Sequence, residues 1–300
     1  MKNKPNFFII GAPKCGTTSL SEYLRTHPNV FFTRPKEPRY FANDIYRPLT
    51  EFEDYVALFN KVSENHLAIG EGSAIYLISK VAIGNIKEFA PGAKLIAMIR
   101  NPIQMIPSLH SQLLISLNEN EEDFEKAWGL QESRREGKNI PKTCRTPIFL
   151  QYAYVGRLGS QLERLFQTYD RKLVKVIIFD DFVKSTKNVY EDTLAFLGLP
   201  SDGKGEFPKF RANKISRSQT VSRFVRRPPK PLKSVYFKTK KFFNLGTLGL
   251  FRRIKSMNSK EAKRKTVSQE MKQELVETFR EDILLMSDLL DRDLTHWLEV

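Results

Sequence analysis

Short apolar runs alternate with stretches of helical periodicity along most of the chain. The runs are FFII (Phe7–Ile10), LAIGE (Leu67–Glu71), KLIAMIR (Lys94–Arg100) and the start of LVKVIIFDDF (Leu173–Phe182). They are continuously apolar and do not alternate with polar residues, which is typical of parallel strands buried on both faces. The order strand, helix, strand, helix therefore predicts an α/β fold of three layers, a P-loop-like architecture with a central parallel sheet flanked by helices.

Helical patterns follow each apolar run. We expect helices over Thr17–Arg25, in the stretch that follows Leu67–Glu71 up to about Phe89, along NPIQMIPSLHSQLL, and along FLQYAYVGRLGSQLERLFQTY. Near the end of the chain, at about 268–290, apolar residues recur at helical spacing, which predicts a helix that packs back on the body. These residues are Met271, Leu275, Phe279, Ile283 and Met286. Residues 1–300 are long enough to form one domain with a sizeable core, so we predict a single domain.

The charge is concentrated in one segment at about 209–265. Of the chain's net +15, residues 209–265 carry 19 Lys and Arg against one acid, a net +18. The remaining 30 bases and 33 acids carry −3. The strong basicity therefore belongs to this segment and does not describe the whole surface.

The apolar runs and the number of cysteines indicate in which cellular compartment the protein is expected. No apolar run reaches 18 residues, so no transmembrane helix is expected. The four-residue run near the N-terminus is too short for a signal peptide. Two cysteines, Cys15 and Cys144, are too few for a disulfide framework. These features predict a protein of the reducing cytoplasm.

The stretch NFFIIGAPKCGTTSLSEYL has the form of a phosphate-binding loop between a strand and a helix. Gly11 and Gly16 keep the glycine spacing of a Walker A loop, but the lysine is displaced to Lys14 and Thr17 stands in its place. Backbone N–H groups and the helix dipole still favour an anion there. The alternative for the loop is a tight turn with no ligand. For Cys15 the alternatives are a packing residue and a reactive thiol, and we favour the packing residue. The predicted binding residues are Lys14, Cys15, Gly16, Thr17, Thr18 and Ser19.

A second anion is predicted where KLIAMIR ends. In a nucleotide triphosphatase a later strand usually ends in an acid that holds Mg²⁺, whereas this strand ends in Arg100. Ser108 lies about two turns into the following helix. An arginine at the carboxyl end of a parallel strand faces the ligand crevice and can bind phosphate bidentately. The pattern predicts a ligand with phosphate at two separated places and no metal site.

At these residues the chain resembles the sulfotransferases that use 3′-phosphoadenosine 5′-phosphosulfate (PAPS). GAPKCGTTSL resembles their 5′-phosphosulfate loop, and RNPIQMIPS resembles their 3′-phosphate motif. PKEPRYF (Pro35–Phe41) resembles the segment after the second strand that carries a catalytic acid in the heparan-sulfate-type branch. Bacterial members of that branch are similar in VKVIIFDDFVKSTKNVYEDTLAFLGLP and LLDRDLTHWL. The resemblance implies PAPS as donor, no metal, and transfer of a sulfuryl group to a hydroxyl or amine of a saccharide or glycolipid.

The resemblance also assigns roles to residues. Glu37 matches the catalytic acid, and Lys14 is placed to stabilise charge on the bridging oxygen. Arg39 replaces a histidine that often follows the acid, so it is a candidate for contact with the acceptor or the sulfonate. In GEGSAIY (Gly70–Tyr76), Gly72 replaces a lysine, while Glu71 stays a candidate for acceptor contact. Arg217 and Arg211 fall where the family closes a loop over the adenosine 3′-phosphate.

Several alternatives stay open at this point. Glu37 could be a loop acid paired with Lys36 or Arg39, and Arg217 could belong to a solvated charge run. His110 is a rival base, but it lies two residues after Ser108 and therefore roughly 200° around the helix, which favours a packed or surface role. Rival functions are a P-loop kinase and a non-catalytic module that binds anions or membranes.

The stretch Arg223–Lys255 interleaves bases with aromatic residues and leucines. This mixture suits an anionic membrane surface, a polyanionic saccharide or a lid over the acceptor cleft. Nucleic acid would satisfy the charge alone, but no usual nucleic-acid motif is present, so none is expected as a partner. We therefore predict a cytoplasmic enzyme that can lie peripherally on the inner face of the membrane.

Overall fold

The computed structural model describes residues 4–208, 214–216, 259–261 and 266–299. The chain forms two compact units. The first comprises Met1–Leu109, Gln151–Phe210 and Ser268–Val300, and the second comprises His110–Leu150 and Arg211–Val267. The division falls within helix α4 (Pro102–Ser116). The single domain over residues 1–300 therefore stays a prediction.

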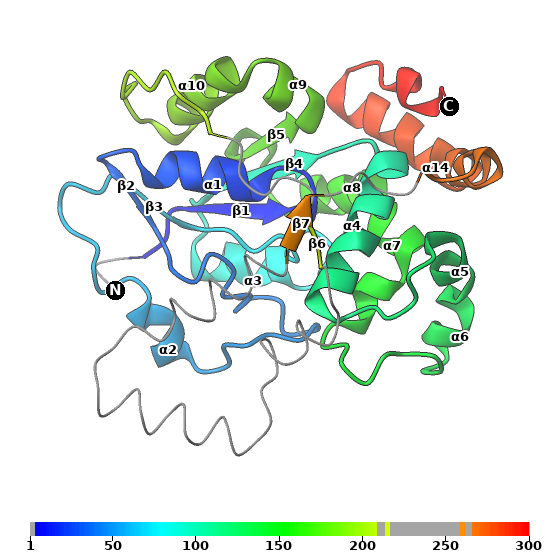
Figure 1. The fold of residues 1–300 in the computed structure, drawn as a ribbon. Helices are drawn as coiled ribbons and strands as arrows, with labels where there is room; N and C mark the ends of the chain where they lie inside the picture. Colours follow the sequence, from blue (N-terminus) through cyan, green and yellow to red (C-terminus); the bar gives the residue numbers. More distant parts are fainter. Residues whose placement is uncertain (1–3, 209–213, 217–258, 262–265, 300) are drawn as a thin grey trace. The chain divides into compact units, whose positions relative to one another are not determined.

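The first unit is built on a parallel sheet of five strands in the order β2-β3-β1-β4-β5 (Figure 1). The central strand β1 pairs with β3 through Phe7 and Gly70 and with β4 through Phe8 and Leu95. Every pairing in this sheet is parallel, which confirms the fold predicted from the continuous apolar runs. The strands are β1 (Phe7–Gly11), β2 (Val30–Phe32), β3 (Ala68–Glu71), β4 (Lys94–Ile99) and β5 (Val174–Ile178).

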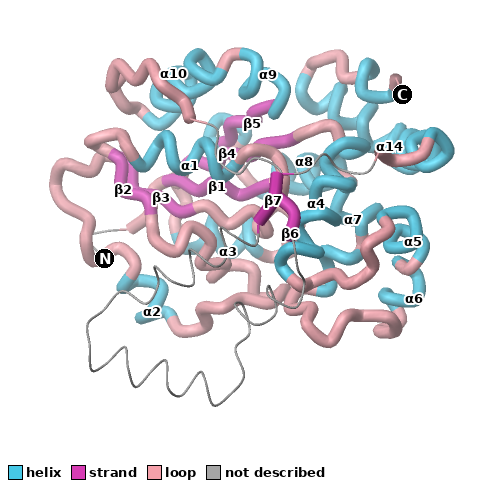
Figure 2. The backbone as a smooth tube through the Cα atoms, in the orientation of Figure 1, coloured by secondary structure: helices cyan, strands magenta, loops and turns pink. Residues whose placement is uncertain are grey.

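Helices cover both faces of the sheet (Figures 1 and 2). From β1 to β2 the chain crosses the sheet in one direction, and from β3 to β4 it crosses in the other. Right-handed crossovers therefore put the two connecting helices, α1 and α3, on opposite faces. The face of α1 (Thr17–Arg25) also carries α9 (Phe179–Lys184) and α10 (Thr186–Leu197). The other face carries α3 (Ala82–Phe89) and α8 (Leu158–Thr168), and α14 (Gln269–Leu290) packs against α8.

The long helix expected over 149–169 is divided into three pieces. They are the 3-10 helix η1 (Pro147–Leu150), α7 (Tyr152–Gly156) and α8. The carboxylate of Asp282 on α14 accepts hydrogen bonds from the backbone N–H groups of Gly159 at 2.6 Å and Ser160 at 3.0 Å. It thereby satisfies donors at the start of α8, so a new helix begins there.

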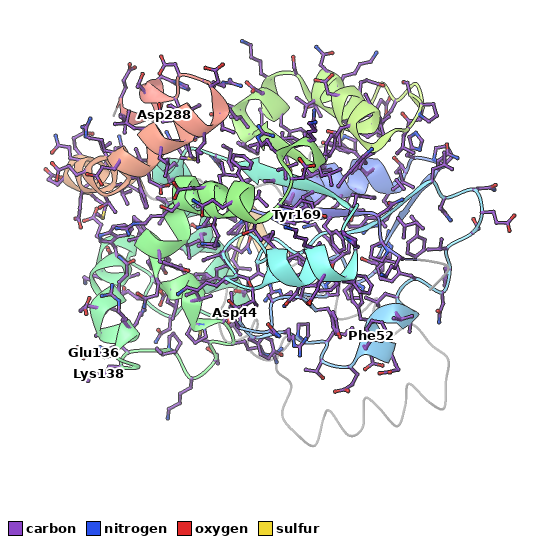
Figure 3. All side chains as sticks on the ribbon, turned by 180° about the vertical axis from the view of Figure 1, so that it is seen from behind. Asp44, Phe52, Glu136, Lys138, Tyr169 and Asp288 are labelled. Atoms are coloured by element: carbon purple, nitrogen blue, oxygen red, sulfur yellow. The ribbon has the colours of Figure 1, made fainter. Side chains whose placement is uncertain are left out.

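The segment after β3 is helical only at its end. Residues 72–81 form turns, and α3 begins at Ala82, whose N–H donates to Ser79 Oγ at 3.0 Å. Ser79 in turn donates to Asp44, labelled in Figure 3, at 2.6 Å. Tyr169, labelled in the same view, donates to the Ala93 carbonyl at 2.8 Å and so ties the end of α8 to the turn before β4. The helical stretch expected between Glu71 and about Phe89 is therefore helical only from Ala82 on, after a turn that Ser79 holds.

The core of the first unit matches the predicted apolar pattern. Phe7–Ile10 are fully buried, and the stripe predicted on the C-terminal helix is buried along α14. On the same helix Asp288, labelled in Figure 3, is exposed. The predicted C-terminal packing helix is thus confirmed. The first unit also contains α2 (Phe52–Ala57), η2 (Arg171–Leu173) and η3 (Thr295–Leu298).

The second unit contains a buried ion pair. Arg134 of α6 (Gln131–Arg135) donates to both carboxylate oxygens of Glu119, at 2.8 and 2.7 Å. This unit also holds α5 (Phe124–Gly129) and an antiparallel pair of strands, β6 (Lys214–Ser216) and β7 (Ser259–Glu261). Glu136 and Lys138, labelled in Figure 3, form an exposed ion pair of 2.7 Å. Across the described ranges, no helix is long and apolar enough to cross a membrane.

Candidate active site

The loop between β1 and α1 presents a helix N-terminus without a side-chain cap. Gly16 occupies the N-cap position with φ 88°, in the left-handed region, and as a glycine it offers no side-chain cap to the helix. Lys14 also has a positive φ of 65°. The first N–H groups of an α-helix lack partners within the helix, and the helix dipole makes this end positive. The loop is therefore arranged to receive an anion.

Cys15 is a packing residue at the base of this loop. Its side chain is fully buried, and Sγ lies 3.5 Å from Met105 Sδ and 3.4 Å from the Pro13 carbonyl oxygen. Burial raises the pKa of the Cys15 thiol to about 12, although Arg100 and Lys14 act in the opposite direction. The thiol is thus neutral, as the packing role requires, and both cations lie close enough to the loop to influence it.

Lys36, Glu37 and Arg39 bring a carboxylate to the start of α1. Lys36 Nζ donates to Thr17 Oγ1 at 3.2 Å and lies 3.4 Å from Glu37 Oε1. On the other side, Arg39 Nη2 donates to Glu37 Oε2 at 3.2 Å. The Glu37 side chain keeps 31% of its surface exposed, so a molecule from solvent can reach it.

The charges around Glu37 keep it ionised. Burial by itself would raise the pKa of Glu37, but Lys36 and Arg39 outweigh burial, and the pKa is lowered from its usual value. A carboxylate that is ionised at neutral pH can accept a proton. Sequence reasoning found Glu37 and its two ionic partners, but it did not place Lys36 against Thr17.

Glu71 lies beneath the site, out of contact with solvent. Its carboxylate is fully buried and accepts hydrogen bonds from the hydroxyls of Tyr76 at 2.7 Å, Ser73 at 2.8 Å and Tyr55 at 3.3 Å. Burial raises the pKa of Glu71 to about 7, while these hydroxyls act in the opposite direction. Ser73 Oγ also accepts the backbone N–H of Arg39 at 3.0 Å. In this structure Glu71 supports the loop of Arg39 and offers no surface to an acceptor, contrary to its predicted role.

Arg100 follows β4 and is held by two neighbours. Nη2 donates to Gln104 Oε1 at 3.0 Å, and the guanidinium lies 4.6 Å from the centre of the Phe179 ring. Its Nε is buried and has no hydrogen-bond partner in the described part of the chain. Ser108, two turns into α4, is 2% exposed. Gln104, one helical turn before Ser108, was missed by sequence reasoning, although its spacing of four from Arg100 was a visible signal.

His110 belongs to the second unit and has a packed environment there. It is 3% exposed, and its Nε2 lies 2.8 Å from the Glu121 carbonyl oxygen, to which it must donate. Burial lowers the pKa of His110 below its usual value. These contacts agree with the packed role favoured over that of a base.

Two further predictions concern the basic segment and a metal site. Arg211, Arg217 and the stretch Arg223–Lys255 lie outside the described residues. Among the residues that are described, no group of three or more His, Cys, Asp and Glu side chains is arranged to hold a metal ion. The structure therefore brings together the start of α1 with Lys36, Glu37 and Arg39, and it places Arg100 near Cys15.

Comparison with known proteins identifies the family. The chain is 30% identical over 255 residues to carbohydrate sulfotransferase 15 of Homo sapiens, covering 65% of this chain and 44% of that protein. It is 30% identical over 113 residues to heparan sulfate glucosamine 3-O-sulfotransferase 3A1 of Mus musculus, covering 38% of this chain and 28% of that protein. The chain thus spans less than half the length of these curated relatives.

The fold has a counterpart among solved structures. A sulfotransferase from Alicyclobacillus acidocaldarius superposes with a TM-score of 0.72 at 23% identity, covering 98% of both chains. The family model of the sulfotransferase domain matches residues 4–284. This match confirms the resemblance inferred from the loop and from the Arg100 motif. The chain belongs to the sulfotransferase domain family.

Proposed function

We propose that this protein is a PAPS-dependent sulfotransferase that transfers a sulfuryl group to a hydroxyl or amine of a saccharide or glycolipid. The observation that carries the proposal is the link from Thr17 through Lys36 to Glu37. It holds an ionised carboxylate beside a helix N-terminus that is open to an anion. A sulfotransferase needs these two elements together, because the acceptor must lose a proton close to the sulfate.

Two features of the chain fit the two anionic ends of PAPS. The uncapped N-terminus of α1 offers backbone donors to the 5′-phosphosulfate, from Lys14 to Ser19. The buried Nε of Arg100, which has no partner among the described residues, suits a 3′-phosphate. Ser108 would add a hydroxyl and, outside the described residues, Arg217 a second cation.

When bound, PAPS would supply a sulfuryl group on a phosphate that leaves with the electron pair of the broken S–O bond. Glu37 would take the proton of the acceptor hydroxyl or amine as the new bond to sulfur forms. Lys14, in the loop before α1, would stabilise the charge that grows on the phosphate oxygen. Arg39 would orient Glu37 and face an anionic acceptor.

The acceptor class rests on the relatives. Carbohydrate sulfotransferase 15 and heparan sulfate glucosamine 3-O-sulfotransferase 3A1 are named for carbohydrate acceptors. This supports a saccharide, either free or linked to lipid. A P-loop kinase fits less well because Thr17 replaces the Walker lysine and Arg100 replaces a magnesium-binding acid.

Calorimetry on the whole protein tests the donor site. Adenosine 3′,5′-bisphosphate should bind more tightly than adenosine 5′-phosphate, and ATP with Mg²⁺ should bind less well than either. Tighter binding of ATP with Mg²⁺ would favour the kinase, and binding of none of the three would favour a non-catalytic module. A panel of saccharides and glycolipids with sulfur-labelled PAPS then tests transfer, and failure of every acceptor to take up label would count against a saccharide.

A further inference from the structure

The Lys36 side chain takes an enclosed path across Gly72 to the start of α1. Its side chain is 12% exposed. A Cβ atom built on Gly72 would lie 3.3 Å from Lys36 Cε, so the lysine passes close over this glycine. Its ammonium ends at Thr17 Oγ1 and Glu37 Oε1. A lysine is seldom enclosed to this extent unless its charge is paired, and here Glu37 and Thr17 hold the ammonium.

Two cations flank the Glu37 carboxylate. Lys36 and Arg39 each form an ion pair with it. Both cations lie at the start of α1, which is the positive end of the helix dipole. Glu71, the next acid in this region, accepts hydrogen bonds from hydroxyl groups of Tyr55, Ser73 and Tyr76. The cluster thus has charge complementarity for a further anion at Thr17.

We propose that Lys36 contacts the sulfonate of the donor and so distinguishes PAPS from the desulfated product, adenosine 3′,5′-bisphosphate. This inference rests on the proposed function and adds a specificity residue to it. The ammonium touches Thr17, where the 5′ end of the donor would lie, and Glu37, where the acceptor would lose its proton. A cation in contact with both would lie beside the sulfuryl group as it is transferred, where it can stabilise charge on the sulfonate oxygens.

The Lys36 side chain can take this position because residue 72 is a glycine. Its φ lies outside the left-handed region, so backbone conformation does not require glycine here. A Cβ would instead meet Phe32 Cζ at 3.0 Å and Lys36 Cε at 3.3 Å. Gly72→Ala should therefore displace Lys36 and weaken PAPS binding more than binding of the bisphosphate.

The central test compares the two nucleotides by calorimetry on Lys36→Met. Losing a charge-assisted contact should weaken PAPS binding roughly ten- to a hundredfold while changing binding of the bisphosphate by no more than about twofold. Lys61→Met, which removes an exposed lysine elsewhere in the first unit, is the control and should change neither affinity. Retained binding of the bisphosphate also shows that Lys36→Met is folded.

A relocated lysine provides a second test. In Lys36→Met/Gly72→Lys the new side chain starts beside the position of Lys36 Cε, so it should recover most of the lost preference for PAPS. If the wild type binds both nucleotides and Lys36→Met weakens both equally or neither, the role of Lys36 is wrong while the donor site stands. If the wild type binds neither nucleotide, the proposed function itself fails. Should the double variant not fold, the single variant decides the question.

Discussion

The guanidinium of Arg100 lies 4.6 Å from the centre of the Phe179 ring. Together with the hydrogen bond from Nη2 to Gln104, this contact fixes the group at the end of β4. Nε is left buried without a partner in the described ranges. A buried donor without a partner costs free energy, so its arrangement is best explained by a ligand that accepts from it.

We therefore expect Arg100→Ala to weaken binding of adenosine 3′,5′-bisphosphate by about 1.5–3 kcal/mol, as for loss of a charged hydrogen bond. Binding of adenosine 5′-phosphate, which lacks the 3′-phosphate, should change little. Calorimetry with both ligands measures the difference. Arg171→Ala is the matched control, because Arg171 also stacks on a ring, that of Phe166 at 4.5 Å. Equal losses for the two ligands would show that Arg100 does not read the 3′-phosphate.

Glu37→Gln should lower turnover by roughly 10²–10⁴-fold, the usual contribution of a general base. Donor affinity should stay within a small factor because the amide keeps the size of the carboxylate. Steady-state rates with an acceptor from the panel measure this effect, with the exposed Glu53→Gln as control. Near-normal turnover of Glu37→Gln would remove Glu37 from its role.

The lowered pKa of Glu37 also predicts a pH profile. Because Lys36 and Arg39 hold the pKa of Glu37 below its usual value, the base stays ionised at neutral pH and activity should fall only in more acidic solution. Arg39→Gln removes one of the two cations, so the acid limb of kcat/KM should move to higher pH. An acid limb that did not move in Arg39→Gln would mean that another group titrates.

The sheet and the two strand–helix units that carry the proposed anion sites could be predicted because each is encoded by neighbouring residues. The apolar run Phe7–Ile10 predicts a buried strand, and the order of Gly16, Thr17 and Thr18 predicts the start of a helix. Arg100 and Ser108 lie on one strand–helix unit, so their spacing was also visible. Such signals depend on local periodicity alone.

Other parts of the site depend on contacts between distant segments. Asp282 caps α8 from 123 residues away, and this contact divided a pattern that reads as one helix. Lys36 reaches Thr17 only because Gly72 leaves room for it, and no local pattern links these three positions. Buried Glu71 likewise accepts a hydrogen bond from Tyr55, which lies 16 residues earlier in the chain. Sequence reasoning thus named the candidate residues but not all of the contacts between them.

Buried Glu71 should make stability depend on pH. Its pKa is raised to about 7 in the folded protein, so the folded state binds this proton more tightly than the unfolded chain does. The stabilising contribution is complete below the unfolded pKa and is lost as pH rises toward and through about 7. This loss should be about 3 kcal/mol at 1.36 kcal/mol per pKa unit.

Denaturant unfolding of the wild type and Glu71→Gln at pH 5 and pH 8 measures this contribution. Glutamine cannot titrate, so the variant should lack most of the decrease that the wild type shows between these two values. Glu53→Gln, at an exposed position, should keep the wild-type dependence. The same decrease in Glu71→Gln as in the wild type would mean that other groups cause it.

Gly16→Ala should disturb both stability and the anion site. The left-handed backbone at φ 88° disfavours an L side chain, and a Cβ would meet Phe179 at 3.2 Å and Met98 at 3.3 Å. We expect a loss of about 1–3 kcal/mol in the free energy of unfolding, together with weaker binding of adenosine 3′,5′-bisphosphate. Gly137→Ala isolates the backbone effect, because Gly137 has φ 82° and nothing within 4 Å of its Cβ position. If both variants lost the same stability and kept full affinity, the packing around Gly16 would be irrelevant to the site.

The basic stretch Arg223–Lys255 should bind vesicles containing anionic lipid and ignore neutral vesicles. Each base near an anionic surface contributes about 1 kcal/mol, and aromatic residues can enter the interface. The attraction should weaken as salt rises, since the Debye length falls from about 10 Å at 0.1 M to about 3 Å at 1 M. The aromatic and leucine residues of this stretch include Phe224, Tyr236, Phe237, Phe242, Phe243, Leu248, Leu250 and Phe251.

Sedimentation of the full chain with both kinds of vesicle at two salt concentrations measures this binding. Phe242→Ser/Phe243→Ser should reduce binding at high salt most, whereas Lys240→Gln/Lys241→Gln should reduce it mainly at low salt, because only the charge term is screened. A lid over the acceptor cleft predicts a different result, namely protection of this stretch from protease when donor and acceptor are present without lipid. Protein that stays in the supernatant with anionic vesicles at low salt would exclude the membrane role and leave the lid as the explanation for this composition.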